Sequence, residues 1–492
     1  MERYLNYIEG QWVPGSGGQW FQSLNPATGE VLGEVAQATP EDVNRAVRAA
    51  RRALDSWRLV PAPRRGEILF RAGEILLRRK EELARLMVQE MGKVLAESRG
   101  DVQEAIDMTF YMAGEGRRLC GETVPSELRD KFAMCVREPV GVVACITPWN
   151  FPLAIPSWKL MPALIAGNTV VFKPASDTPI LAWHLVKILE EAGVPPGVVN
   201  LVFGPGDPVG RALLEHPGVD LLSFTGSTAV GREVGMSAAR ALKRLHLELG
   251  GKNAIIVLSD ANLDLALDGI VWSAFGTTGQ RCTACSRVIV EEKVAEEVTG
   301  RLVERARRLR LGNGLDPQVE MGPLINAAAR EKVHRYVGIG REEGARLLCG
   351  GDFARGGDLD RGFFYLPTVF DQVTPEMRIA QEEIFGPVVA VIRVRDLEEA
   401  IEVGNGTAYG LSSSIYTRDL EKAFRAMREI RSGLVYVNAG TIGAEVHLPF
   451  GGFGVSGSGH REAGRAALEV YTEWKTIYVD FSGRLQRAQI DI

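Results

Sequence analysis

Short apolar runs alternate with longer helix-like stretches from residue 142 onward, and this alternation restricts the possible folds more than any other feature of the sequence. Each apolar run has the length of a buried strand, and each stretch between two runs has the length of a helix. Such alternation predicts a parallel sheet covered by helices on both faces. The expected strands are Val142–Ile146, Thr169–Lys173, Val198–Phe203, Leu221–Phe224 and Asn253–Val257, and the expected helices are Leu160–Ala166, Ile180–Ala192, Pro208–Glu215 and Ala229–Leu242.

The same alternation begins again after Gly251 and predicts a second α/β unit. A chain of 492 residues is longer than one hydrophobic core usually supports, so two large domains are expected. The strands expected in the second unit are Arg287–Val290, Val388–Val394 and Leu434–Val437, and the helices are Val294–Leu309, Leu397–Val403 and Leu420–Arg428.

The two ends of the chain differ from this pattern. Thr39 is an N-cap residue before a proline, and apolar residues then recur at helical spacing up to Trp57. Further helices are expected over Arg64–Met91 and Leu95–Gly114. Near the other end, Thr476–Phe481 alternates like a strand that has no partner nearby in the sequence. An exposed strand edge is often covered by another subunit, so this segment predicts an oligomer.

Composition and charge exclude several classes of function. A formal net charge of −5 gives no electrostatic reason to expect nucleic acid or an anionic membrane as partner. The most apolar stretch, residues 141–172, contains Pro148, Pro152, Pro156 and Pro162, which a membrane-spanning helix would not tolerate. The first residues lack the apolar segment of a secretory signal. Six cysteines in so long a chain indicate reduced thiols in the cytoplasm rather than a disulfide framework.

Cys282 is the first candidate for chemistry. It stands in a glycine-rich loop directly before an expected strand, where its thiolate could act as a nucleophile. A buried structural cysteine is the other interpretation. With Cys285 it forms a C-x-x-C pair, which is typical of redox pairs or of half a metal site. No second pair in the sequence completes such a site, so no metal is expected.

Three other segments could surround that cysteine. Asn150 follows an expected strand at the edge where α/β sheets bind ligands, and its amide suits an oxyanion hole or simply a turn. Glu248 precedes a glycine pair and is either a general base or a solvated carboxylate. Phe224–Thr228 joins a strand to a helix through Gly226 and capping hydroxyls, a geometry that favours phosphate.

Together these segments resemble the aldehyde dehydrogenase superfamily, and the resemblance spans nearly the whole chain in the family's order. Any single match could arise by chance, but the full series in sequence order could not plausibly do so. The matching stretches are Thr147–Pro152 (TPWNFP), Phe172–Pro174 (FKP), Phe224–Thr228 (FTGST), Glu248–Lys252 (ELGGK), Gly279–Cys282 (GQRC), Glu382–Pro387 (EEIFGP) and Pro449–Gly452 (PFGG).

The resemblance implies an α/β fold with a Rossmann-like cofactor-binding domain, a second α/β catalytic domain and a small β element for oligomerisation. The cofactor-binding domain would comprise residues 1–118 and 140–250, and the catalytic domain residues 251–445. The oligomerisation element would comprise residues 119–139 and 472–492. A homodimer or homotetramer is expected on this basis.

The resemblance also implies NAD- or NADP-dependent oxidation of a small-molecule aldehyde to a carboxylate. Cys282 would carry the thiohemiacetal and then the thioester, while Asn150 and the backbone N–H of Cys282 would stabilise the oxyanion. Glu248 would activate the water that hydrolyses the thioester. Relatives that release the thioester to CoA generally lack this carboxylate, so Glu248 favours hydrolysis. Glu462 matches a family carboxylate that would relay protons.

For the cofactor, the resemblance places Lys173 near the adenosine ribose, Gly226 and Ser227 at the pyrophosphate, and Glu383 on the nicotinamide ribose. Ser176 stands where NAD-preferring members often carry a glutamate, and a neutral hydroxyl could tolerate the 2′-phosphate of NADP. The predicted cofactor-binding set is Ile146, Thr147, Pro148, Trp149, Lys173, Ser176, Gly206, Phe224, Gly226, Ser227, Leu249, Gly250, Glu383 and Phe385.

The substrate tunnel implied by the resemblance contains Phe151, Trp158, Arg281, Thr283 and Phe450. The stretches GQRCTA and TIGAEVHLPFGG look like those of members that oxidise carboxylated semialdehydes, and the cation of Arg281 would suit a carboxylate tail. A broad-specificity aldehyde dehydrogenase is the alternative. An alternative of another class is a non-catalytic binding or structural protein that keeps this fold.

Overall fold

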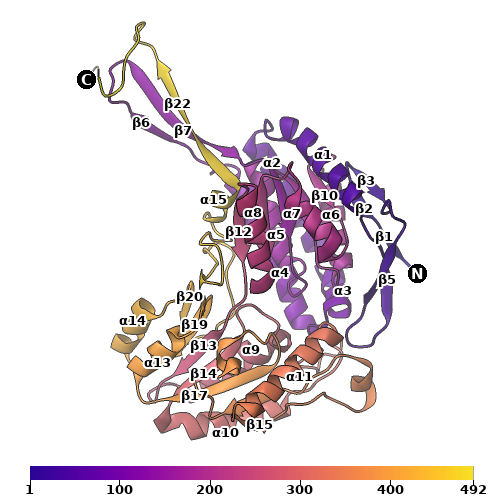
Figure 1. Ribbon diagram of the computed structural model, residues 1–492, viewed down its shortest axis with the longest axis vertical. Helices are drawn as coiled ribbons and strands as arrows, with labels where there is room; N and C mark the ends of the chain where they lie inside the picture. The colour runs from indigo at the N-terminus through magenta and orange to yellow at the C-terminus, as the bar shows by residue number, and fades with distance from the viewer. Residues whose placement is uncertain (491–492) are drawn as a thin grey trace.

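The computed structural model describes residues 1–490 and contains two large sheets with a separate three-stranded arm (Figure 1). The last two residues of the predicted oligomerisation element, 491 and 492, lie outside the described residues. The first sheet has the order β12-β11-β8-β9-β10-β2-β3. Its strands are β12 (Arg244–Glu248), β11 (Leu221–Thr225), β8 (Val142–Ile146), β9 (Thr169–Lys173), β10 (Val199–Leu201), β2 (Asn6–Ile8) and β3 (Gln11–Val13).

Helices cover both faces of this sheet, as the sequence predicts. Along β8, Val142 and Ala144 pack into one core, while Val143 and Cys145 pack into another, because successive side chains of a strand point to opposite faces. The first core includes α1 (Pro40–Trp57), α7 (Arg211–Glu215) and α8 (Thr228–Arg240); the second includes α2 (Ala62–Arg78), α3 (Lys80–Met91), α4 (Leu95–Glu115), α5 (Ala154–Ala166) and α6 (Pro179–Glu191).

The second sheet confirms the second α/β unit. Its strands run parallel except β15, in the order β15-β16-β17-β14-β13-β19-β20. They are β15 (Arg346–Cys349), β16 (Thr368–Asp371), β17 (Val388–Val394), β14 (Cys285–Glu291), β13 (Asn253–Val257), β19 (Ser412–Tyr416) and β20 (Leu434–Val437). The helices around it are α9 (Leu263–Phe275), α10 (Glu292–Arg308), α11 (Ala327–Glu342), α12 (Arg378–Gln381), α13 (Leu397–Asn405) and α14 (Leu420–Glu429).

The arm projects from the body of the molecule beside the carboxyl terminus (Figure 1). It consists of β6 (Glu122–Pro125), β7 (Lys131–Pro139) and β22 (Thr472–Asp480), joined in antiparallel pairs. As expected, β22 has no partner nearby in the sequence, since it pairs along its whole length with β7, which lies far earlier in the chain. Its other edge stays open in the described chain, because β22 ends the order β22-β7-β6.

Smaller elements complete the chain. A short sheet of β1 (Arg3–Tyr4), β5 (Val31–Ala36) and β4 (Trp20–Leu24) lies near the amino terminus. Near the carboxyl end, β18 (Tyr409–Gly410) pairs with β21 (Phe453–Gly454), and α15 (Ala467–Tyr471) precedes the arm. None of the helices within residues 1–490 has the length and apolar character needed to cross a membrane.

Three expected helices differ from the structure. The predicted helix Arg64–Met91 divides into α2 and α3, because Arg79 leaves the helical region with φ −96 and ψ 8. The helix expected from Leu160 begins earlier, at Ala154, and contains Pro162. The helix expected from Pro208 begins as a π-helical turn, Gly206–Gly210, that leads into α7 at Arg211. Asp207 within this turn is extended, a conformation that the residue before a proline prefers.

Candidate functional site

A cleft of about 1040 Å³ lies where the carboxyl ends of the first sheet's strands meet the second α/β unit. Parallel strands present their carboxyl ends at one edge, so the residues after β8, β9 and β11 converge there. Fifteen predicted residues share the lining of this cleft. They are Ile146, Thr147, Pro148, Trp149, Asn150, Lys173, Gly206, Phe224, Gly226, Ser227, Leu249, Gly250, Cys282, Glu383 and Phe385.

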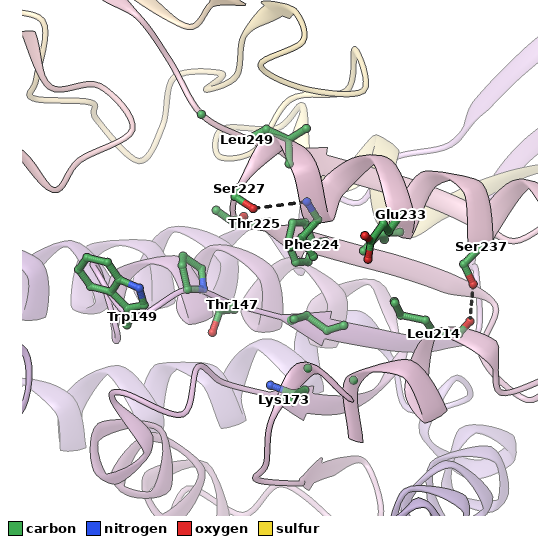
Figure 2. A pocket seen from close by; sticks show the side chains of 18 of the residues that line it. Thr147, Trp149, Lys173, Leu214, Phe224, Thr225, Ser227, Glu233, Ser237 and Leu249 are labelled. Carbon is green, nitrogen blue, oxygen red and sulfur yellow. Dashed lines mark hydrogen bonds between the residues drawn. The ribbon is translucent and has the colours of Figure 1, made fainter. Parts of the chain in front are cut away.

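One wall of the cleft is the beginning of α8. Figure 2 shows Phe224, Thr225 and Ser227 at this helix end, across the pocket from Lys173. Ser227 is the N-cap, and its hydroxyl oxygen accepts a hydrogen bond from the Val230 N–H at 3.4 Å. The open N–H groups of a helix start attract anions, so this wall suits a phosphate.

Lys173 lines the cleft and can bind a ligand there, whereas Ser176 does not line it. Lys173 is buried, and burial lowers the pKa of its ammonium group to about 8. Its Nζ donates one hydrogen bond to the Pro174 carbonyl at 3.1 Å, which leaves two N–H groups for a ligand. Ser176, in contrast, does not line the cleft, because its hydroxyl donates to the Gly204 carbonyl at 3.1 Å.

The opposite wall comes from the second unit. The Glu383 carboxylate accepts a hydrogen bond from the Gly251 N–H at 3.1 Å, and burial raises the pKa of Glu383. A Cβ atom added at Gly250 would lie 2.4 Å from Glu383 Oε2, so a larger residue here would displace the carboxylate. Phe385 meets Trp149 edge to face with ring centroids 5.6 Å apart, which joins the two walls.

Cys282 lies at the inner end of the cleft, just before β14. Its carbonyl accepts a hydrogen bond from Asn253 Nδ2 at 2.7 Å, which holds the loop in place. Burial raises the pKa of the thiol well above its ordinary value, and the charges of Glu248 and Glu383 add to this effect. The thiol is therefore protonated at neutral pH when the cleft holds only the protein's own groups.

Asn150 faces the same space with one donor to spare. It is 3% exposed, and its Nδ2 donates to the Gln280 carbonyl at 3.0 Å. An amide nitrogen carries two hydrogens, so this bond fixes the side chain and leaves the second N–H available. Gln280 is itself held, because its Oε1 accepts a hydrogen bond from the Ile325 N–H at 2.9 Å.

Glu248 ends β12 but does not line the cleft. The carboxylate is buried beneath Gly451, where an added Cβ atom would lie 2.6 Å from Glu248 Oε1. Both carboxylate oxygens lack a hydrogen-bond partner among the described residues. Burial raises the pKa of Glu248 well above its usual range, and the nearby charge of Glu462 raises it further. Because Cys282 lines the cleft and Glu248 does not, a rotation of the side chain would be needed to bring this carboxylate to Cys282.

The five predicted substrate residues lie outside the main cleft lining. Trp158 and Phe450 meet edge to face with centroids 5.1 Å apart, in the same hydrophobic cluster against which Cys282 packs. The Arg281 guanidinium lies 5.3 Å from the ring centroids of both Phe151 and Trp272. Thr283 is half-buried beside Cys282 in the chain, with no side-chain hydrogen bond to another predicted residue.

Several lining residues escaped the sequence analysis. Glu233, Ser237 and Arg240 lie on the cleft side of α8, and Lys332 comes from α11. The helical spacing of the first two was a usable signal, because residues three and four apart share a helix face. Nothing in the sequence pointed to Lys332, which reaches the cleft only through the packing of the second unit.

Comparison with known proteins identifies this arrangement. The model of the aldehyde dehydrogenase family matches residues 12–477. The chain belongs to this family. It is therefore an oxidoreductase that acts on an aldehyde group, as the seven motifs predicted.

Two sequence relatives and one crystal structure match nearly the full length of the chain. An alpha-ketoglutarate semialdehyde dehydrogenase of Haloferax volcanii is 46% identical over 96% of this chain and 98% of its own. An alpha-ketoglutaric semialdehyde dehydrogenase of Bacillus subtilis is 43% identical over 97% and 98%. A crystal structure of betaine aldehyde dehydrogenase from Staphylococcus aureus in complex with NAD+ has a TM-score of 0.96 at 37% identity and covers 98% of this chain and 96% of its own.

The protonated state of this aldehyde dehydrogenase's thiol can be tested directly. Because burial raises the pKa of Cys282, iodoacetamide should alkylate it slowly at neutral pH. The rate should still rise above about pH 8.5, the ordinary pKa of a free thiol. Peptide mass spectrometry over a pH series measures this rate, with the exposed Cys120 as the internal reference. A plateau near neutral pH would contradict the raised pKa.

Proposed function

We propose that this aldehyde dehydrogenase oxidises its substrate through a thioester on Cys282, and that Glu248 is the base for hydrolysis. The observation that carries the proposal is the placement of the Cys282 thiol and the spare Asn150 N–H in one cleft. The buried Glu248 carboxylate, free of hydrogen-bond partners among residues 1–490, supports the second part. A non-catalytic protein on this fold would have no reason to keep the thiol and the amide in one cleft and a buried, unpaired carboxylate outside its lining.

The enzyme uses NAD or NADP, and the cleft fits a dinucleotide. The hydroxyl oxygens of Thr147 and Thr225 line it, yet they are buried without a partner among the described residues, as expected where a polar ligand binds. Lys173 would hold the adenosine ribose, the start of α8 the pyrophosphate, and Glu383 the nicotinamide ribose. When bound, the nicotinamide accepts the hydride that the substrate carbon gives up.

Cys282 begins the reaction by forming a carbon–sulfur bond to the aldehyde carbon as its thiol proton passes to solvent water. The carbonyl oxygen becomes an alkoxide, which the second N–H of Asn150 and the backbone N–H of Cys282 stabilise. A preorganised donor of this kind contributes about 3 kcal/mol. Loss of hydride from the carbon then leaves the acyl group on sulfur as a thioester.

Glu248 acts in the second half of the reaction. It takes a proton from water as the oxygen bonds to the thioester carbon, and the carbon–sulfur bond breaks to give the carboxylate product and Cys282. Because burial raises the pKa of Glu248, its ionised form, and with it hydrolysis, increases as pH rises through that pKa.

The roles of Cys282 and Glu248 can be separated by kinetics. Glu248→Gln should give a burst of reduced cofactor of about one equivalent, followed by a steady rate lowered roughly 100-fold or more, because the thioester forms but is not hydrolysed. Cys282→Ala should give neither burst nor turnover. Stopped-flow absorbance of the reduced nicotinamide measures both. Parental turnover in either variant would show that the residue has another role.

We also propose that the substrate is a carboxylated semialdehyde, as the names of the two relatives suggest. Arg281 donates from Nε to Thr277 Oγ1 at 2.9 Å and from Nη2 to Glu97 Oε1 at 3.3 Å. A guanidinium has five N–H groups, so three remain for a carboxylate tail. Glu104 interacts electrostatically with Arg281, and burial raises its pKa to about 8. It is then largely protonated at neutral pH and does not repel such a tail.

Arg281→Gln tests this substrate class. With glutaric semialdehyde, kcat/KM should fall about 10- to 100-fold, because hydrogen bonds to a charged partner are lost. With pentanal, a neutral aldehyde of the same length, kcat/KM should change little. NAD and NADP are compared in the same assay of absorbance at the reduced-nicotinamide band. Equal rates of the parent on both aldehydes would favour the broad-specificity alternative.

The arm supports proposals about assembly and domain limits. We propose a homodimer or homotetramer, supported by the open edge of β22 and by exposed Trp474, Tyr478 and Phe481 on or beside it. Sedimentation of the full chain would give the assembly's mass, and a monomer at micromolar concentration would exclude this proposal.

The division into residues 1–118 with 140–250, 251–445, and 119–139 with 472–492 accords with the two sheets and the arm. Six free cysteines support a cytoplasmic location.

A further inference from the structure

A buried histidine lies beside the proposed base. His246 stands on β12 and points to the same face as Glu248, because side chains two residues apart on a strand share a face. It is 0% exposed. Its Nε2 lies 4.0 Å from Glu248 Oε1 and has no hydrogen-bond partner among the described residues. This separation is roughly 1 Å longer than a hydrogen bond.

The proton on His246 can be located from its neighbours. The Lys159 ammonium can only donate, and it bonds to Ser223 Oγ at 3.2 Å and to the Glu462 carboxylate. Tyr471 lies 3.0 Å from Ser223 Oγ, and burial raises the pKa of this phenol, which keeps its hydrogen. Ser223 is the one hydrogen-bond partner of Tyr471 OH in residues 1–490, so it accepts from both groups.

Ser223 then has its own hydrogen left to donate. His246 Nδ1 lies 3.4 Å from Ser223 Oγ and 3.7 Å from Glu462 Oε1. Only the Ser223 contact is within hydrogen-bond distance, so we infer that Nδ1 accepts the Ser223 hydrogen. Burial lowers the pKa of His246 well below its ordinary value, so the ring is neutral and carries a single N–H. With Nδ1 occupied as an acceptor, that N–H is on Nε2. It faces Glu248, whose carboxylate oxygens have no other partner in the described chain.

We propose that His246 is a positioning residue whose Nε2–H binds the buried Glu248 carboxylate and favours its ionised form between hydrolysis steps. The inference rests on the proposed role of Glu248 and extends it. A hydrogen bond to the charged form of an acid opposes the effect of burial. Ser223 contributes without touching Glu248, because it selects the tautomer of the ring.

Other charged groups surround this pair and are common to every variant considered below. Lys159 on α5 and Arg461 stabilise the Glu248 charge, while Glu462 opposes it. His460 lies on the other side of the His246 ring, with centroids 6.4 Å apart. The charge of Glu248 also interacts with the Cys282 thiol.

The test follows hydrolysis of the acyl-enzyme without cofactor. A nitrophenyl ester acylates Cys282, and intact-protein mass spectrometry then measures loss of the acyl group across a pH series. In the parent, the rate rises with pH as Glu248 ionises. In His246→Leu the hydrogen-bond donor is lost and the pKa of Glu248 rises. The rising limb of the plot of rate against pH should therefore shift to higher pH by about one unit or more.

Two further variants distinguish this role from packing. Ser223→Ala frees Nδ1 to carry the hydrogen, so Nε2 no longer donates, and the limb should move in the same direction. His246→Gln keeps an N–H that can reach Glu248, and its limb should stay near that of the parent. His184→Gln, at a half-buried histidine on α6, is the matched control and should leave the limb unchanged.

Some results would overturn the inference. If the limbs of His246→Leu and Ser223→Ala coincide with the parent's, or their rates fall equally at every pH, His246 does not act on the ionisation of Glu248. If His246→Leu does not fold, Ser223→Ala and His246→Gln still decide the question. If the parent forms no acyl-enzyme, the proposed function fails and this inference fails with it.

Discussion

The short connection Leu249–Lys252 is the constraint on which the rest of the site depends. It joins the carboxyl end of β12 in the first sheet directly to the start of β13 in the second. The ends of the first sheet's strands therefore face the beginning of β13 and β14, where Asn253 holds the Cys282 carbonyl. Gly251 is required in this connection, because an added Cβ atom would lie 2.6 Å from that carbonyl oxygen. These few residues make the Glu383 contact and the sheet-to-sheet junction, and they directly follow Glu248.

The second constraint is the cost of burying charge. Glu248, Glu462, Lys159 and His246 are all nearly inaccessible to solvent, and only part of their hydrogen-bonding capacity is used. A buried ion pair is a weak source of stability, because desolvation offsets most of the attraction. The buried chamber formed by these four residues is therefore better explained by chemistry than by a gain in folding stability. Outside this chamber, apolar cores pack on both faces of each sheet, as is usual for α/β proteins.

Local patterns predicted the elements well where sequence and packing agree. β8, β9, β13, β17 and β20 have the predicted bounds, because buried parallel strands are continuous apolar runs with clear ends. β12 was not predicted, because Arg244 and His246 interrupt its apolar pattern. The break at Arg79 and the extended Asp207 in the turn before α7 depend on backbone angles at single residues, which periodicity does not report.

The sequence alone determined the family and the α/β class, because seven motifs in fixed order encode them, and the same motifs contain the proposed reacting groups. It did not determine which of these groups would be charged. A glutamate two residues before a glycine pair has the composition of a solvated side chain, and only the packing of Gly451 and β12 places Glu248 in a buried chamber. Likewise, the positions of Lys332 and of the proton on His246 depend on partners distant in sequence. Burial and hydrogen bonding between such partners set ionisation, and both arise only from the tertiary structure.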